Sequence, residues 1–204
     1  MHPNPIYHTA DAAKNLAFAR SRAFGSLSVA TEDGPLVSHI PFLLSDDGTT
    51  AEFHLVRSNP IARALHRPLR AILAVNGPDS YISPDWYGME NQVPTWNYVA
   101  VHLKGDVTLQ PQETMRDLLD RQSADYEQRL LPKTPWKVGK VDPDALDMLL
   151  RMILPCRLAI TAVDGTWKFS QNKPEAARLG AAEGAEAGGF GAEVALLAAM
   201  MRGA

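Results

Sequence analysis

Two short segments of this chain place charged, amide and aromatic side chains where they could bind a ligand. The first is Arg57-Ser58-Asn59-Pro60-Ile61-Ala62-Arg63, in which we expect a strand to end and a helix to begin after Ser58 or Asn59. Free N–H groups at a helix N-terminus, together with guanidinium groups, bind phosphate well. A capped helix with solvated arginines explains the same residues, so the segment alone leaves both interpretations open.

The second segment runs from Val93 to Gly105, where alternating residues predict a long β-strand with two chemically different faces. Trp96, Asn97 and Tyr98 stand near its beginning, where a plain strand would carry aliphatic residues. Aromatic rings with polar ends suit a planar ligand rich in nitrogen and oxygen, although such rings also close the corners of β-barrels. The polar run 168–173 is related, because its amides could read a heterocycle or satisfy backbone groups at a strand end.

Other kinds of active site find little support. The chain has no Gly-x-Ser-x-Gly sequence and no glycine-rich phosphate loop. Cys156 is the single cysteine and lies in an apolar run, so a structural thiol is favoured, and we predict no metal site. His39 and His102 are the candidates for a general acid or base, but a structural role is favoured for each.

Composition limits the classes of partner. The formal net charge is −3, and we find neither clustered Lys and Arg nor a helix-turn-helix pattern, so direct DNA binding is not expected. No apolar run reaches the length of a membrane span, and the N-terminus lacks the layout of a signal peptide. One cysteine allows no internal disulfide, and we therefore expect a cytoplasmic protein with no membrane part.

The pattern of apolar residues predicts a mainly β (α+β) protein, a barrel of about six antiparallel strands with peripheral helices. Asp-Gly pairs mark tight hairpins, including a last hairpin across Asp164-Gly165. We expect strands at 24–30, 36–44, 51–57, 70–75, 80–83, 93–105, 156–163 and 166–170, and helices at 11–22, 60–67, 112–131 and 143–153.

The composition changes after Asn172, where Ala, Gly and Glu dominate. We expect residues 180–191 to form a low-complexity linker that need not be ordered, followed by a possible terminal helix at 192–202. The chain therefore divides into a folded domain at 1–172 and an Ala/Gly-rich C-terminal tail at 173–204.

Several segments, taken in order, resemble one known family. They are Ser38–Leu44, His54–Pro60, Gly77–Tyr87, Val93–Gly105 and Lys168–Asn172, and together they span most of the chain. They are similar to the PaiB-like family of FMN-binding proteins, which are described as negative transcriptional regulators. Asp79 stands where the family is expected to carry His, and a carboxylate close to a flavin phosphate would be unfavourable.

The resemblance implies an FMN-binding split β-barrel over residues 1–172, as in pyridoxamine-phosphate oxidase and flavin reductases, with FMN at the interface of a homodimer. It also implies roles for individual residues. The phosphate would be held by Arg57, Ser58, Asn59 and Arg63. The isoalloxazine would be lined by Trp96, Asn97 and Tyr98, and it would also be reached by Gln171 and Asn172 from the same chain or the partner.

The expected function is flavin-dependent redox chemistry or redox sensing, so that an FMN-dependent oxidoreductase is possible. The alternative is a transcriptional regulator that acts through DNA or a partner without flavin chemistry. A barrel that has lost its flavin and serves only as an interaction module is a third hypothesis. FMN is the expected cofactor, while the residues alone also allow FAD or a pyridoxal vitamer.

Overall fold

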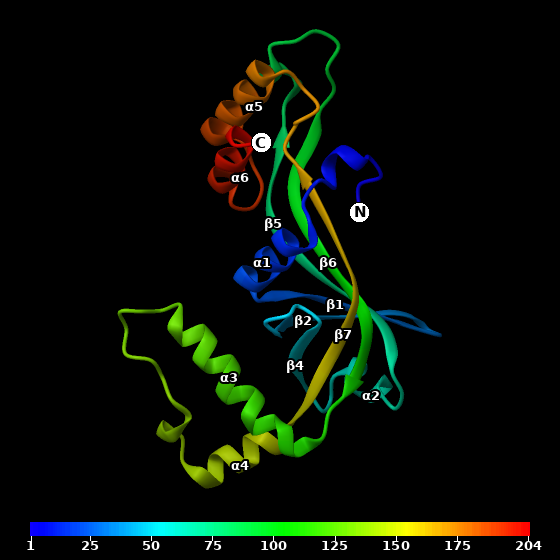
Figure 1. Cartoon of the computed structure of the whole chain (residues 1–204), viewed down its shortest axis with the longest axis vertical. Helices are drawn as coiled ribbons and strands as arrows, with labels where there is room; N and C mark the ends of the chain where they lie inside the picture. Colours follow the sequence, from blue (N-terminus) through cyan, green and yellow to red (C-terminus); the bar gives the residue numbers. More distant parts are fainter. The chain divides into compact units, whose positions relative to one another are not determined.

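The computed structural model describes residues 1–204, and Figure 1 labels its α-helices and most of its strands. The strands are β1 (Phe24–Thr31), β2 (Gly34–Pro41), β3 (Leu43–Leu44), β4 (Thr50–Val56), β5 (Leu69–Ile82), β6 (Thr95–Leu109) and β7 (Ile153–Lys168). The α-helices are α1 (Ala12–Arg22), α2 (Pro60–Ala64), α3 (Met115–Gln128), α4 (Pro143–Arg151), α5 (Glu175–Gly188) and α6 (Val194–Arg202). Short 3-10 helices are η1 (Pro5–Tyr7), η2 (Pro84–Tyr87), η3 (Gln112–Thr114) and η4 (Val138–Lys140).

The seven strands form one sheet in the order β2-β1-β5-β6-β7-β4-β3, in which the paired neighbours with a defined register are antiparallel. The chain divides into two compact units. The first unit contains Met1–Phe18, Val75–His102 and Val163–Ala204, and the second contains Ala19–Ala74 and Leu103–Ala162. The three long strands β5, β6 and β7 therefore contribute residues to both units.

The second unit is built on two antiparallel pairings, one a hairpin and the other between strands far apart in the sequence. β1 pairs with β2 from Phe24↔Pro41 to Thr31↔Gly34, and Gly34 has φ +112°, a value that favours glycine in a tight turn. β4 pairs with β7 from Thr50↔Ala159 to Val56↔Ile153. Alternate residues of these strands are buried, among them Leu27, Val29, Phe53 and Leu158, which form the core.

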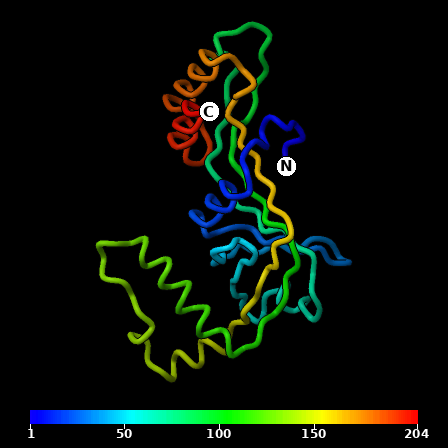
Figure 2. The backbone as a smooth tube through the Cα atoms, in the orientation of Figure 1, coloured from blue at the N-terminus to red at the C-terminus, as the bar shows by residue number.

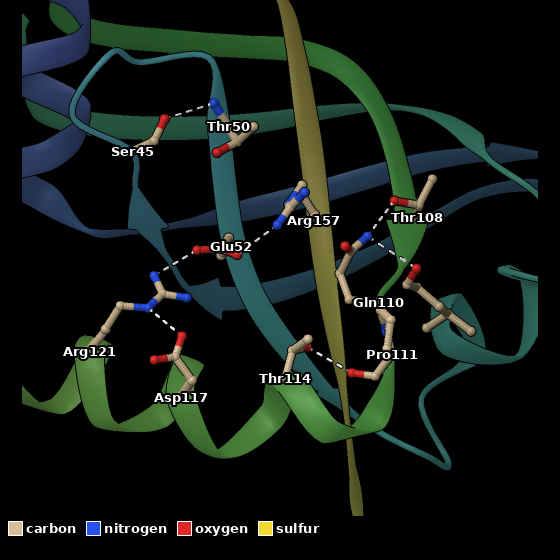
Figure 3. Close-up of polar contacts among 11 residues, drawn as sticks. Ser45, Thr50, Glu52, Thr108, Gln110, Pro111, Thr114, Asp117, Arg121 and Arg157 are labelled. Atoms are coloured by element: carbon tan, nitrogen blue, oxygen red, sulfur yellow. Dashed lines mark hydrogen bonds and ion pairs between the residues drawn. The ribbon is translucent and has the colours of Figure 1, made fainter.

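Helix α3 is joined to this sheet by the carboxylate of Glu52 on β4 (Figure 3). Glu52 accepts from Arg121 of α3 at 2.7 Å and from Arg157 of β7 at 3.3 Å. Arg121 also pairs with Asp117 one turn away, at 2.7 Å. The backbone trace in Figure 2 follows α3 and α4 as they lead from β6 to β7. The two arginines are exposed and Glu52 is partly buried, so these ion pairs connect α3 with the sheet at its solvent-facing edge.

The chain ends with two helices, α5 and α6, which pack against each other within the first unit. The buried residues of α5 and α6 are mostly alanines, together with Arg178, Leu197 and Met201, so the two helices approach closely. A Cβ atom at Gly184 would lie 2.3 Å from Cγ of Trp86 on η2, which explains why α5 needs small residues where it meets η2. The expectation of a linker at 180–191 is therefore wrong, because α5 extends to Gly188. The predicted terminal helix is present as α6.

Two of the expected strand breaks are also wrong. The hairpin across Asp164-Gly165 is instead the continuous strand β7, and the break at 76–79 lies inside the continuous strand β5. A Cβ atom at Gly165 would lie 2.0 Å from Oδ1 of Asn15, and one at Gly77 would lie 2.6 Å from Cζ of Phe18. Both glycines serve a close approach of side chains from α1 and not a turn.

The remaining elements follow the prediction with shifted ends. The helix expected at 60–67 ends early at Ala64, and the one expected at 112–131 is divided into η3 and α3. The structure has no helix that is both long and apolar enough to cross a membrane. The boundary placed after residue 172 stays a prediction.

Cys156 of β7 provides a test of this packing. Its side chain is 1% exposed, and burial raises the pKa of the thiol to about 12. We expect the native protein to resist iodoacetamide at about pH 8, because the thiol is both protonated and covered. Mass spectrometry should show one added group only after denaturation. Rapid, stoichiometric labelling of the native protein would contradict this burial.

Candidate functional site

The predicted site residues fall into two groups, one in each unit. Arg57, Ser58, Asn59 and Arg63 belong to the second unit, whereas Trp96, Asn97, Tyr98, Gln171 and Asn172 belong to the first. Each group is complete within its own unit, and the two have different chemistry: one is cationic, and the other is aromatic and amide-rich.

The guanidinium of Arg57 lies directly after β4 and joins three parts of the second unit. Its Nε donates to the carbonyl of Arg151 at 2.5 Å, and its Nη2 donates to Oε1 of Gln112 at 2.8 Å. Gln112 in turn donates to the carbonyls of Leu150 and Ile153, at 3.0 and 3.2 Å. A guanidinium has five N–H groups, so Arg57 keeps donors free while its position is fixed by neutral acceptors.

Asn59 is the N-cap of α2, as predicted. Its Oδ1 accepts from the backbone N–H of Ile61 at 2.9 Å, and its Nδ2 donates to Oγ of Ser38 at 3.0 Å. The amide is thus largely used inside the protein. Ser58 and Arg63 are exposed, so they and Arg57 carry any capacity of this segment to bind an anion.

In the first unit, β6 places Asn97 on the face opposite to Trp96 and Tyr98. The Asn97 side chain is fully buried; its Nδ2 donates to Oγ of Ser170 at 2.9 Å and contacts Sδ of Met201 at 3.5 Å. Ser170 also bonds the hydroxyl of Tyr87 at 2.9 Å. In this conformation the amide predicted to touch a ligand is instead the centre of a buried polar network.

Trp96 and Tyr98 lie on the accessible face of β6. Trp96 is 43% exposed and packs edge-on against Tyr81 and Phe190, at centroid distances of 6.3 and 5.5 Å. Trp96 and Tyr98 line an open groove of about 470 Å³ that also includes Gly77 and Asp79. Its size lies in the range of small-molecule sites, roughly 300–1,000 Å³.

Asp79 lines this groove, and its carboxylate is anchored to the backbone through one oxygen. Its Oδ1 accepts from the backbone N–H of Ala192 at 3.0 Å, and its own N–H donates to the carbonyl of Ala192 at 2.9 Å. The aspartate that departs from the family pattern therefore holds the segment between α5 and α6 in place.

Gln171 and Asn172 follow the end of β7 and bond mainly within the protein. Gln171 accepts from the N–H of Phe169 at 2.7 Å and donates to the carbonyls of Trp167 and Ile6, at 2.6 and 3.3 Å. Asn172 is exposed, and its Oδ1 accepts from the Tyr7 hydroxyl at 3.1 Å.

Sequence reasoning noted the polar run 168–173 for its amides but gave no role to Lys168 and Lys173, which line a small pocket beside Ser170 and Asn172. The available signal was the placement of two lysines around the Ser-Gln-Asn run. Their shared pocket depends on how the chain turns at Ser170, which has φ +61°. That turn has no marker in the sequence, because serine rarely adopts this conformation.

The Asn97 network yields a stability prediction. Replacing Asn97 with Ala should lower the free energy of unfolding by about 1–3 kcal/mol, because buried hydroxyl groups lose a partner. Urea denaturation of both proteins measures the difference. Asn172→Ala is the matched control, since it removes an exposed amide with one bond to Tyr7. Equal losses in the two variants would show that the network is not the stabilising feature.

Comparisons with known proteins bear on this site. A family model described as "Putative FMN-binding domain" matches residues 1–162, which include every predicted site residue except Gln171 and Asn172. The chain is 31% identical over 161 residues to the protease synthase and sporulation protein PAI 2 of Bacillus subtilis (strain 168), covering 78% of this chain and 76% of that protein. It is 27% identical over 208 residues to an uncharacterized protein of Emericella nidulans, covering 82% and 83%.

Solved structures share the fold. The FAD and heme binding protein from Mycobacterium smegmatis has a TM-score of 0.61 at 16% identity, covering 91% of this chain and 82% of that chain. The flavocytochrome Anf3 from Azotobacter vinelandii has a TM-score of 0.54 at 14% identity, covering 82% of this chain and 72% of that chain.

The mainly β, split-barrel fold expected from the sequence is confirmed, with seven strands where about six were expected. The resemblance to the PaiB-like proteins is confirmed as well, and the chain belongs to this FMN-binding domain family.

Proposed function

We propose that this protein binds FMN and performs or senses a redox reaction. The observation that carries the proposal is the family match over residues 1–162, which includes the exposed arginines and the accessible aromatic face of β6. Bound flavin would supply hydride or electron transfer, while the protein supplies binding and orientation.

The residues present fit a flavin. Arg57 and Arg63 are exposed cations without a carboxylate partner, which suits a phosphate. Trp96 and Tyr98 offer aromatic surface along an open groove, which suits the isoalloxazine ring. Asn97, by contrast, would contribute by fixing the strand that carries these rings. Gln171 and Asn172 stay candidates for contacts with the ring.

A homodimer is part of the same proposal. The cationic group and the aromatic group belong to different units of the chain, and in a dimer a site can take residues from both copies. Two flavins at the subunit interface, as the family resemblance implies, would use both groups. No residue is proposed as catalytic: His39, one candidate, bonds Oγ of Ser26 at 2.9 Å, which supports a structural role.

Regulation of transcription is the second candidate, and it rests on the resemblance to the PaiB-like proteins, which are described as negative transcriptional regulators. The formal net charge of −3 argues for action through a partner over direct contact with DNA. A mobility shift at physiological salt with specific competitor DNA would reveal direct binding, which the charge does not favour.

The flavin and the dimer can be tested together. We expect the purified protein to carry a flavin absorbance band that stays with it through gel filtration at a dimer mass. The cofactor released by denaturation should have the mass of FMN, not of FAD. A colourless protein that fails to bind added FMN would refute the proposal and favour a barrel that serves only in protein interactions.

The placement of the phosphate can be tested with Arg57→Gln/Arg63→Gln. We expect FMN binding to weaken by roughly 2–6 kcal/mol if both arginines make charge-assisted bonds. Riboflavin, which lacks the phosphate, should bind the variant and the original protein equally. The control is Arg67→Gln/Arg116→Gln, which removes the same charge from exposed positions of the same unit. Unchanged FMN affinity relative to this control would refute the placement.

A further inference from the structure

A second, smaller pocket in the first unit has a chemistry that the proposed flavin site does not use. It has a volume of about 160 Å³, and its polar lining includes Lys168, Lys173, Tyr7, Tyr87 and Thr95. We call it the lysine pocket. None of the residues that line it is acidic.

Both lysines are held by neutral oxygen atoms. Nζ of Lys168 donates to Oγ1 of Thr95 at 2.5 Å, and Nζ of Lys173 donates to Oε1 of Gln92 at 2.5 Å. Neither lysine forms an ion pair. An ammonium group has three donors, so each lysine retains N–H groups that the protein does not use. Burial lowers the pKa of Lys168, and an anion bound beside it would favour its charged form.

Two tyrosine rings support these cations. Nζ of Lys168 lies 5.8 Å from the ring centroid of Tyr7, and Nζ of Lys173 lies 5.4 Å from that of Tyr87. The negative face of an aromatic ring attracts an ammonium group without neutralising it. Burial raises the pKa of both tyrosines, so their phenols stay neutral and do not cancel the lysine charge.

The walls of the pocket are fixed before any ligand arrives. The Tyr87 hydroxyl bonds Ser170, which is held by the buried amide of Asn97. The Tyr7 hydroxyl donates to Asn172 at 3.1 Å. Holding side chains in place in advance reduces the entropy lost on binding, so a preorganised pair of ammonium groups can bind a small ligand well.

We propose that the lysine pocket binds a small oxyanion, such as a phosphate or a carboxylate. Its volume of about 160 Å³ is below the roughly 300 Å³ at which drug-sized sites begin, which excludes a flavin ring and admits a compact anion. Two cations without a carboxylate make the site selective for negative charge. The proposal does not rest on flavin binding, although Asn172 borders both this pocket and the expected flavin residues.

Calorimetry with inorganic phosphate, and separately with succinate, tests the proposal on the full chain at constant salt. We expect an anion-binding site whose affinity is at least tenfold weaker in Lys173→Met and in Lys168→Met than in the original protein. Lys14→Met is the matched control, because Lys14 lies over the ring of Trp167 in the same unit but does not line the pocket. Lys173→Arg keeps the charge and should retain binding.

Lys173 is the better test position should Lys168→Met fail to fold, because Lys173 follows the strand whereas Lys168 is its last residue. Absence of binding by both anions, or equal affinities in Lys173→Met and Lys14→Met, would overturn the proposal.

Competition with FMN and riboflavin identifies the source of the anion. If FMN displaces phosphate and riboflavin does not, the pocket binds the phosphate of the cofactor; if neither displaces it, the pocket serves a free anion. A protein that binds phosphate but no flavin would sustain this inference and refute the proposed function.

Discussion

The buried amide of Asn97 is the constraint on which the first unit depends. An amide enclosed on an otherwise apolar strand face must find hydrogen-bond partners, since an unsatisfied group of this kind costs about 1–3 kcal/mol. Here the partner is Ser170, which reaches Asn97 from a left-handed backbone conformation just beyond β7. The same hydroxyl binds Tyr87 of η2, so one serine joins three parts of the chain. The turn at Ser170 also brings Lys173 back beside Lys168 of β7, and thus a structural requirement shapes the candidate binding surface.

The class of fold and most helices could be predicted from the sequence. The spacing of apolar residues and the residues that begin and end a helix are local properties of the chain. The prediction failed where tertiary contacts decided the outcome. Asp33-Gly34 and Asp47-Gly48 form turns with positive φ at the glycine, as their composition indicates. Asp164-Gly165 has the same composition and remains extended, because its glycine makes room for Asn15, which accepts from Trp167 at 2.8 Å. An Asp-Gly pair shows that one position lacks a side chain. It does not show whether a turn or a neighbouring side chain uses the space.

The site was predictable in its residue types and less so in its geometry. Alternation along β6 correctly separates an inward row, which includes Val99 and Val101, from an outward row with Trp96 and Tyr98. Asn97 belongs to the inward row, so its neighbours in sequence face away from it. In the same way, the helix that begins after Asn59 is real, but its cap uses much of the amide that a ligand would need. Composition names the side chains near a site, and only the fold decides which of them face it.

The partners of the cations distinguish compensated from uncompensated positive charge. Arg121 and Arg157 share the carboxylate of Glu52, so their charge is largely compensated and their role is to connect α3 with the sheet. Arg57, Lys168 and Lys173 are held instead by amide, hydroxyl and carbonyl oxygens. A neutral acceptor fixes the position of a cation without reducing its net charge, which a carboxylate would do. Fixed and uncompensated positive charge is the property that an anion site requires, and for this reason both the expected phosphate site and the lysine pocket fall where the chain supplies ordered cations without acids.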